Sequence, residues 1–130
     1  MMFLLFVNPL PKLTMLKVEK SFTASFDVDP QCGFTFICPD ELPIDEGDKI
    51  AYELNSQACF ASLRLVSKDS HPKDAFWITT DPEQIMKPII GDYPNLDIKW
   101  PAHCILGTKG NQLIPGLPDE QYYDLVINKG

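Results

Sequence analysis

Three short apolar segments joined by long connections restrict the possible folds of this chain more than any other feature of its sequence. They are residues 21–28 (SFTASFDV), 63–67 (LRLVS) and 122–128 (YYDLVIN). The first alternates apolar with small or polar side chains and ends at Asp29-Pro30, as a strand does before a turn. The connections carry no hairpin signal, and strands joined by long connections pair in parallel. The sequence therefore predicts an α/β fold with a parallel sheet.

One helix is expected between the first two strands. Asp45 can cap free backbone N–H groups at its start, and Asp48 adds negative charge to the first turn. Apolar residues then recur every three or four positions and form one stripe: Ile50, Leu54, Ala58 and Ala61. Residues 31–42 and 70–101 are expected to be irregular, and the second of these segments holds five of the twelve prolines.

Composition excludes several classes of function. The 130 residues are 45% hydrophobic and 22% charged, which is the balance of one soluble globular domain. Eighteen acidic against eleven basic side chains give a formal charge of -7. Such a surface repels phosphate backbones and anionic lipids, so neither nucleic acid nor membrane is an expected partner.

The N-terminus and the cysteines indicate the cell compartment. The first apolar run ends at Val7, far short of the roughly 20 residues that a spanning helix needs, and no basic residue precedes it. We expect a cytoplasmic protein in which residues 1–20 are a poorly packed extension and residues 21–130 form the domain; Met15 would be a better start. Four cysteines without a C-x-x-C pair predict free thiols, not disulfides or a structural zinc site.

Polar residues follow each predicted strand. Asp29 follows the first, Asp69 and His71 follow the second, and Lys129 follows the third. In open parallel sheets, ligand sites lie outside the carboxyl ends of the strands. We therefore expect a carboxylate, a chelating pair and an ammonium at one edge of the sheet. Asp27 competes with Asp29 for the role of base, because residues two apart share a strand face.

The spacing of two histidines and one aspartate is consistent with a metal site. In extended backbone, Asp69 and His71 point to the same side, where a carboxylate oxygen and an imidazole nitrogen can bind one divalent ion. His103 supplies the third ligand that a catalytic site needs, which leaves coordination positions open. The alternative is an ordinary polar loop, since such residues recur by chance. Lys129 beside a carboxylate favours the ionised form of that carboxylate, or stabilises developing negative charge.

Four ordered motifs carry a family resemblance. DPQCGF (residues 29–34), KDSHP (68–72), WPAHC (100–104) followed by GTKG (107–110), and NKG (128–130) resemble the nicotinamidase (pyrazinamidase) branch of the isochorismatase-like cysteine hydrolases. The resemblance covers residues 22–130. It implies a three-layer α/β/α fold with a mostly parallel sheet, here truncated.

The same resemblance implies an activity and roles for residues. In that family a cysteine thiolate attacks nicotinamide, ammonia leaves, and water releases nicotinic acid from the thioester, a step of NAD salvage. Asp29 would be the general base and Lys129 its charge partner. The metal ion would be zinc, with iron or manganese as alternatives, and it would orient the substrate ring. Phe34 and Trp100 would flank that ring, or simply pack in the core.

The sequence departs from the family pattern at two points, and both bear on whether this chain is active. Ala75 stands where many relatives have another histidine, so the metal would have fewer protein ligands. None of the four cysteines matches the family nucleophile, which lies beyond the lysine strand. We therefore expect an N-terminal portion that does not hydrolyse amides alone and that self-associates through an open sheet edge.

Two alternative functions remain open. The chain could be a non-catalytic metal-binding or regulatory remnant that pairs with another subunit. It could also derive from a metal-free relative that acts on isochorismate or ureido substrates, although the WPAHC histidine argues against that branch.

Overall fold

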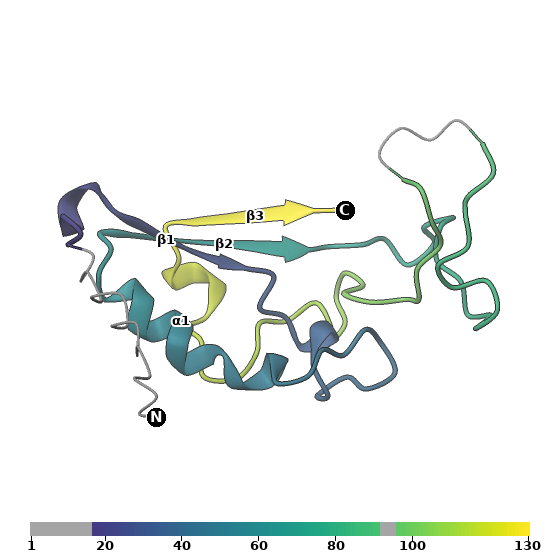
Figure 1. Cartoon of the computed structure of the whole chain (residues 1–130), viewed down its shortest axis with the longest axis horizontal. Helices are drawn as coiled ribbons and strands as arrows, with labels where there is room; N and C mark the ends of the chain where they lie inside the picture. Colours follow the sequence, from purple (N-terminus) through teal and green to yellow (C-terminus); the bar gives the residue numbers. More distant parts are fainter. Residues whose placement is uncertain (1–16, 92–95) are drawn as a thin grey trace, which may run out of the picture.

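Three parallel strands form the centre of the protein (Figure 1). The structure is a computed structural model that describes residues 17–91 and 96–130, so most of the expected N-terminal extension lies outside the described residues. β1 (Ala24–Val28) pairs with β2 (Leu63–Asp69), which pairs with β3 (Leu125–Lys129). The order across the sheet is β1-β2-β3. The predicted α/β fold with a parallel sheet is confirmed, and the carboxyl ends of the three strands lie at one edge.

β1 and β3 begin later than their sequence patterns suggest. Residues Lys20–Phe22 form a 3₁₀ turn before β1, and Glu120–Tyr122 form another before β3. β2 instead continues to Asp69, because Lys68 and Asp69 pair with Asn128 and Lys129 of β3. The extension carries Asp69 to the very end of the sheet.

The helix differs from its prediction. α1 (Ala51–Ala58) begins six residues after Asp45, and a 3₁₀ turn, Gly47–Lys49, precedes it. Glu46 has a left-handed backbone (φ 64°) that separates Asp45 from the helix, so Asp45 does not cap it. The expected start was wrong because a local turn of the chain outweighs the capping signal. α1 lies below the sheet in Figure 1 and covers one of its faces.

A largely buried ion pair between β1 and β2 also contacts α1. Asp27 of β1 is 0% exposed and accepts hydrogen bonds from Arg64 at 2.7 and 2.9 Å and from Tyr123 at 2.9 Å. Arg64 also donates to Asn55 of α1 at 2.9 Å. The α1 side of the sheet is therefore held by charged groups, and Asp27 serves packing between elements.

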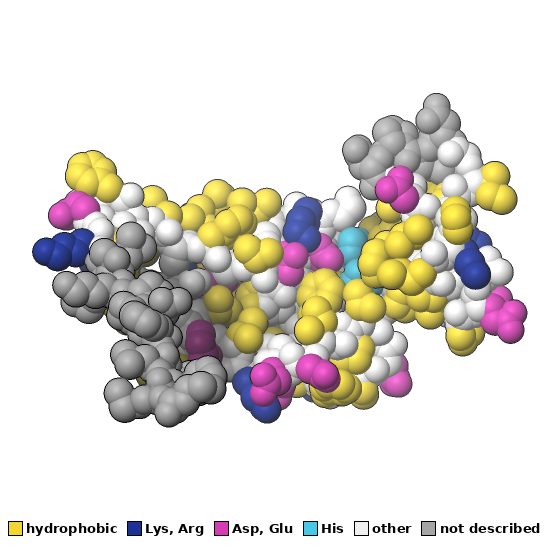
Figure 2. All heavy atoms as spheres, viewed as in Figure 1, with side chains coloured by type: hydrophobic (Ala, Val, Ile, Leu, Met, Phe, Trp, Pro, Cys, Tyr) yellow, Lys and Arg dark blue, Asp and Glu magenta, His cyan; other side chains and the backbone are white. Residues whose placement is uncertain are grey.

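The apolar side chains of β1 lie on the opposite face. Phe26 is 47% and Val28 61% exposed, whereas Ser25 and Asp27 are buried. Leu63, Leu125 and Ile127 are similarly exposed, and Phe26, Leu65 and Leu125 lie in register across the three strands. Figure 2 shows hydrophobic side chains gathered along this part of the molecule. We call this surface the open face.

The connection between β2 and β3 is almost entirely irregular, as predicted. Its first part forms a lobe beyond the carboxyl ends of the strands, held by isolated bridges between His71 and Ile105 and between Ile78 and Trp100, and its last part returns below the sheet to the start of β3 (Figure 1). No helix in residues 17–91 and 96–130 is long and apolar enough to cross a membrane.

Candidate metal centre and active site

The predicted polar residues meet at the carboxyl edge of the sheet. The Lys129 ammonium lies 2.9 Å from Asp29 Oδ2 and forms a second ion pair with Asp69. Ser67 donates a hydrogen bond of 2.7 Å to the other oxygen of Asp29. Burial lowers the pKa of Lys129, but hydrogen bonds to Asp69 and Asp29 outweigh this effect and raise it. Lys129 thus joins two carboxylates as a permanent positive charge.

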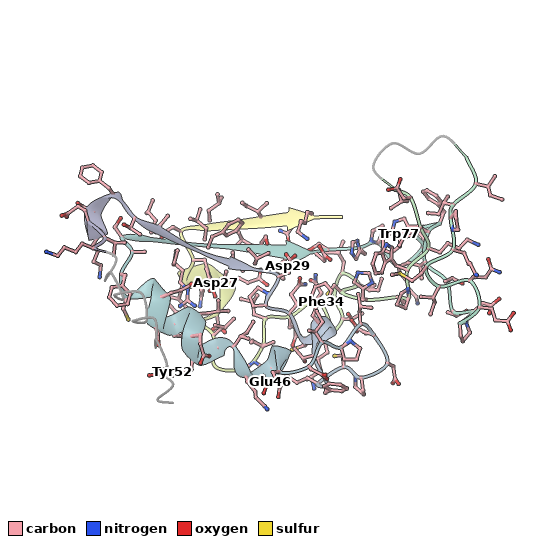
Figure 3. All side chains as sticks on the ribbon, viewed as in Figure 1. Asp27, Asp29, Phe34, Glu46, Tyr52 and Trp77 are labelled. Atoms are coloured by element: carbon pink, nitrogen blue, oxygen red, sulfur yellow. The ribbon has the colours of Figure 1, made fainter. Side chains whose placement is uncertain are left out.

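Asp29 is placed by a sharp turn at the end of β1. Its backbone is left-handed (φ 48°), a conformation that aspartate tolerates better than most residues. Figure 3 shows Asp29 at this strand end, with Phe34 nearby and Trp77 beyond the sheet. Asp27 cannot share this role, because it is enclosed by Arg64 and Tyr123 on the other face.

Asp69, His71 and His103 bring three ligand atoms together. One atom from each residue lies within 4.8 Å of the others. Asp69 Oδ2 is 3.5 Å from Nε2 of His71 and 3.8 Å from Nε2 of His103. The three side chains are at most 16% exposed. In Figure 2 a histidine surface lies between acidic side chains and a hydrophobic cluster.

The two histidines are held differently. His103 Nδ1 lies 2.8 Å from the Pro101 carbonyl, so Nδ1–H donates there and Nε2 keeps its lone pair. Neither ring nitrogen of His71 has a hydrogen-bond partner among the described residues. Burial, and secondly the nearby His103, lower the pKa of His71 and favour neutral imidazole.

These features fit a divalent metal ion. Buried polar nitrogens without a partner are rare and call for an unseen ion or water. Neutral imidazole is the form that binds metal, and two histidines with one carboxylate form a common catalytic ligand set. Ala75, at the position of the expected family histidine, offers no ligand. Asp69, His71 and His103 would therefore hold the ion with open coordination positions.

Buried amides fix the backbone of Asp69. The side chain of Gln31, which is 0% exposed, accepts a hydrogen bond of 2.7 Å from Asp69 N and donates one of 2.8 Å to Asp69 O. Asn111 donates a further bond of 2.7 Å to that carbonyl. The sequence prediction missed these roles, although Gln31 belongs to a motif singled out there. The available signal was a glutamine two residues after Asp29, at the end of the first predicted strand.

A pocket of about 290 Å³ opens beside the three ligands. Phe34 and Trp100, the two aromatic residues named from the sequence, line it together with Trp77, Leu42 and Leu96. The Phe34 ring lies 5.6 Å from that of His103, and the Trp100 ring lies 6.3 Å from it. The pocket thus combines aromatic walls with a polar floor, which suits a small flat molecule that carries one polar group.

Cys104 is next to His103 in sequence but is poorly suited to attack a substrate. It is 0% exposed. Burial, then the Asp69 and Glu41 carboxylates, raise its pKa to about 12. The four cysteines are all unpaired, as expected, and burial also raises the pKa of Cys32 and Cys38. Thiolate chemistry requires a depressed pKa instead.

Comparison with known proteins defines the fold class. The sequence matches no protein-family model and no curated protein. The structure is similar to a nicotinamidase pyrazinamidase from Acinetobacter baumanii, with 29% identity, a TM-score of 0.69, and coverage of 82% of this chain and 51% of that one. The pyrazinamidase of Pyrococcus horikoshii, solved in complex with zinc, is 26% identical with a TM-score of 0.50 and the same coverages.

The yeast nicotinamidase bound to the inhibitor nicotinaldehyde is 22% identical, with a TM-score of 0.63 and coverage of 82% and 56%. The described residues thus have the α/β fold of the isochorismatase-like hydrolases. Within that class, the chain resembles the nicotinamidase and pyrazinamidase branch, as its motifs predicted, and spans about half the length of these three proteins.

Proposed function

We propose that this chain supplies the metal ligands, the general base and the substrate pocket of a nicotinamidase-type amidohydrolase. The reaction would convert nicotinamide to nicotinic acid and ammonia in NAD salvage, in the cytoplasm. The observation that carries this proposal is the continuous chain of contacts from Asp29 through Lys129 to Asp69, directly beside both histidines. A general base and a metal centre thus adjoin one aromatic pocket.

Each residue of the site has a separate role in this proposal. Asp29 takes the proton of an attacking thiol, and Lys129 keeps positive charge beside the carboxylate. Phe34 and Trp100 enclose the aromatic ring of the amide. A divalent ion held by Asp69, His71 and His103, with zinc as the first choice and iron or manganese as alternatives, would orient the ring nitrogen of the substrate.

The attacking thiol itself is not provided by Cys104, given its burial and its pKa of about 12, and none of the other three cysteines lines the pocket. We therefore propose that the 130-residue polypeptide does not release ammonia by itself. The same observation favours the second candidate, a non-catalytic metal-binding subunit that pairs with another protein. A metal-free relative acting on isochorismate or ureido substrates is less well supported, because it leaves the unpartnered nitrogens of His71 unexplained.

Metal and ligand binding by the purified chain test this proposal. We expect about one equivalent of Zn²⁺ by elemental analysis, and nicotinamide binding to the metal-loaded protein in ligand-observed NMR. Asp69→Asn should lower metal affinity about 10- to 100-fold, while the exposed Asp74→Asn control, on the same loop, should match the parent.

An ammonia-release assay separates the candidates. Metal and nicotinamide binding without ammonia support a nicotinamidase site that lacks its nucleophile. Metal binding without nicotinamide binding supports the non-catalytic subunit. Ammonia release that stops on thiol alkylation would contradict the proposed inactivity of this polypeptide.

A further inference from the structure

Trp77 packs directly against His71, one of the three candidate metal ligands. Its ring centre is 4.7 Å from that of His71 at an interplanar angle of 83°, an edge-to-face contact. It is also 5.9 Å from the ring of His103, and only 8% of Trp77 is exposed. Edge-to-face pairs contribute beyond simple area burial, because the positive edge of one ring meets the negative face of the other.

His71 lacks the support that His103 has. His103 is oriented by the hydrogen bond from Nδ1 to the Pro101 carbonyl, at 2.8 Å. No such bond fixes His71 among the described residues. Its Nδ1 side instead faces the backbone of Gly130, where an added Cβ would come within 3.0 Å. The imidazole of His71 thus has the Gly130 backbone near Nδ1 and the Trp77 ring in edge-to-face contact.

Trp77 is itself anchored by backbone contacts. Its carbonyl accepts a hydrogen bond of 3.1 Å from Trp100 N, and the neighbouring Ile78 forms a bridge with Trp100. The Trp100 carbonyl accepts a further bond of 3.0 Å from Thr79 N. These contacts join the segment after His71 to the segment before His103. The indole is therefore fixed relative to both ligands.

We propose that Trp77 is a positioning residue that holds the His71 imidazole with Nε2 directed toward Asp69 and His103. Trp77 orients His71 by aromatic packing, whereas the Pro101 carbonyl orients His103 by a hydrogen bond. Loss of such outer partners weakens metal binding about 10- to 100-fold. The inference rests on the metal site of the proposed function, and it assigns a role that lies outside the ligands themselves.

Zn²⁺ affinity, measured by chelator competition, tests the inference in three variants. Trp77→Leu keeps an apolar side chain but removes the ring, so its dissociation constant should rise about tenfold or more. Trp77→Phe retains an aromatic edge and should remain within about threefold of the parent. Phe60→Leu makes the same type of change at a residue just after α1 that is 63% exposed, and should leave affinity unchanged.

Cobalt supplies a second readout that simple destabilisation does not mimic. The visible absorption of bound Co²⁺ depends on ligand geometry and should change in Trp77→Leu but not in Phe60→Leu. Since the chain has two tryptophans, Trp100→Phe leaves Trp77 as the sole tryptophan, which can be excited selectively over the four tyrosines. Its emission should be quenched by Co²⁺ and the quenching should saturate at one equivalent, which keeps the inference falsifiable if Trp77→Leu does not fold.

The outcomes distinguish the inference from the proposal on which it rests. A parent protein that binds neither Zn²⁺ nor Co²⁺ would overturn the metal site and the role of Trp77 together. A parent that binds both ions, with equal affinity and an equal cobalt spectrum in Trp77→Leu, would overturn the role of Trp77 alone. Absence of quenching in Trp100→Phe despite bound Co²⁺ would also overturn it.

Discussion

Lys129 shows how single side chains at the strand ends form one unit. Its ammonium contacts Asp29 and Asp69, which are 100 and 60 positions earlier in the chain. Parallel pairing makes this meeting predictable, because residues that follow neighbouring strands emerge at one edge. Gln31 and Trp77 were not predictable in the same way. Their roles depend on how an irregular loop folds back, and such a loop has no periodicity to reveal it.

The thiols offer a direct check on individual side chains. Iodoacetamide at pH 8 should label exposed Cys59 within minutes and leave Cys104 unmodified until the protein is denatured. The reason is that Cys104 is 0% exposed and its pKa is raised to about 12. Peptide mass spectrometry identifies the labelled sites. Rapid labelling of Cys104 in the folded protein would argue against this arrangement.

Among the secondary-structure elements, β1 best shows what the alternation of apolar and polar residues can and cannot predict. Its alternation correctly predicts a strand, but the polar half of the strand is buried and the apolar half lies on the open face. The reversal follows from Asp27, whose partner Arg64 comes from the neighbouring strand. Alternation shows that two faces differ, and it does not show which face the helix covers. Likewise, the start of α1 depends on the left-handed Glu46, which no capping rule anticipates.

The Asp27–Arg64 pair should contribute strongly to stability. Arg64→Met would leave a fully buried carboxylate without its cation and should lower the free energy of unfolding by about 3 kcal/mol. Lys49→Met is the matched control, because Lys49 forms an ion pair with Glu46 in which both side chains are more than two-thirds exposed, at 69% and 77%. Urea denaturation followed by circular dichroism measures both. Equal losses in the two variants would contradict a special role for the buried pair.

For the protein as a whole, the open face is the dominant surface feature. A sheet with one helix-covered face and one exposed apolar face has hydrophobic area that soluble proteins normally cover. Both β1 and β3 are edge strands of the described sheet, and edge strands offer unpaired backbone groups. The net charge of -7 acts against association.

We therefore expect the isolated chain to self-associate. Sedimentation velocity should show a mean mass that rises with protein concentration. The double variant Phe26→Lys/Ile127→Lys should reduce this rise, because it places charges on the open face. Phe36→Lys adds one charge at a residue that is 58% exposed away from the strands and should have little effect. A monomer at all concentrations with a high, cooperative melting transition would contradict the expectation.

The position of Lys129 on β3 has a consequence for local unfolding. β3 is an edge strand whose side chains are mostly exposed, so its amide protons should exchange with solvent earlier than those of β2, which is flanked on both sides. Each opening of β3 withdraws the ammonium from both carboxylates while the histidines stay on the lobe. The ion pairs of Lys129 with Asp29 and Asp69 therefore last only as long as β3 stays paired. Hydrogen exchange of the β3 amides would measure how often these ion pairs are formed.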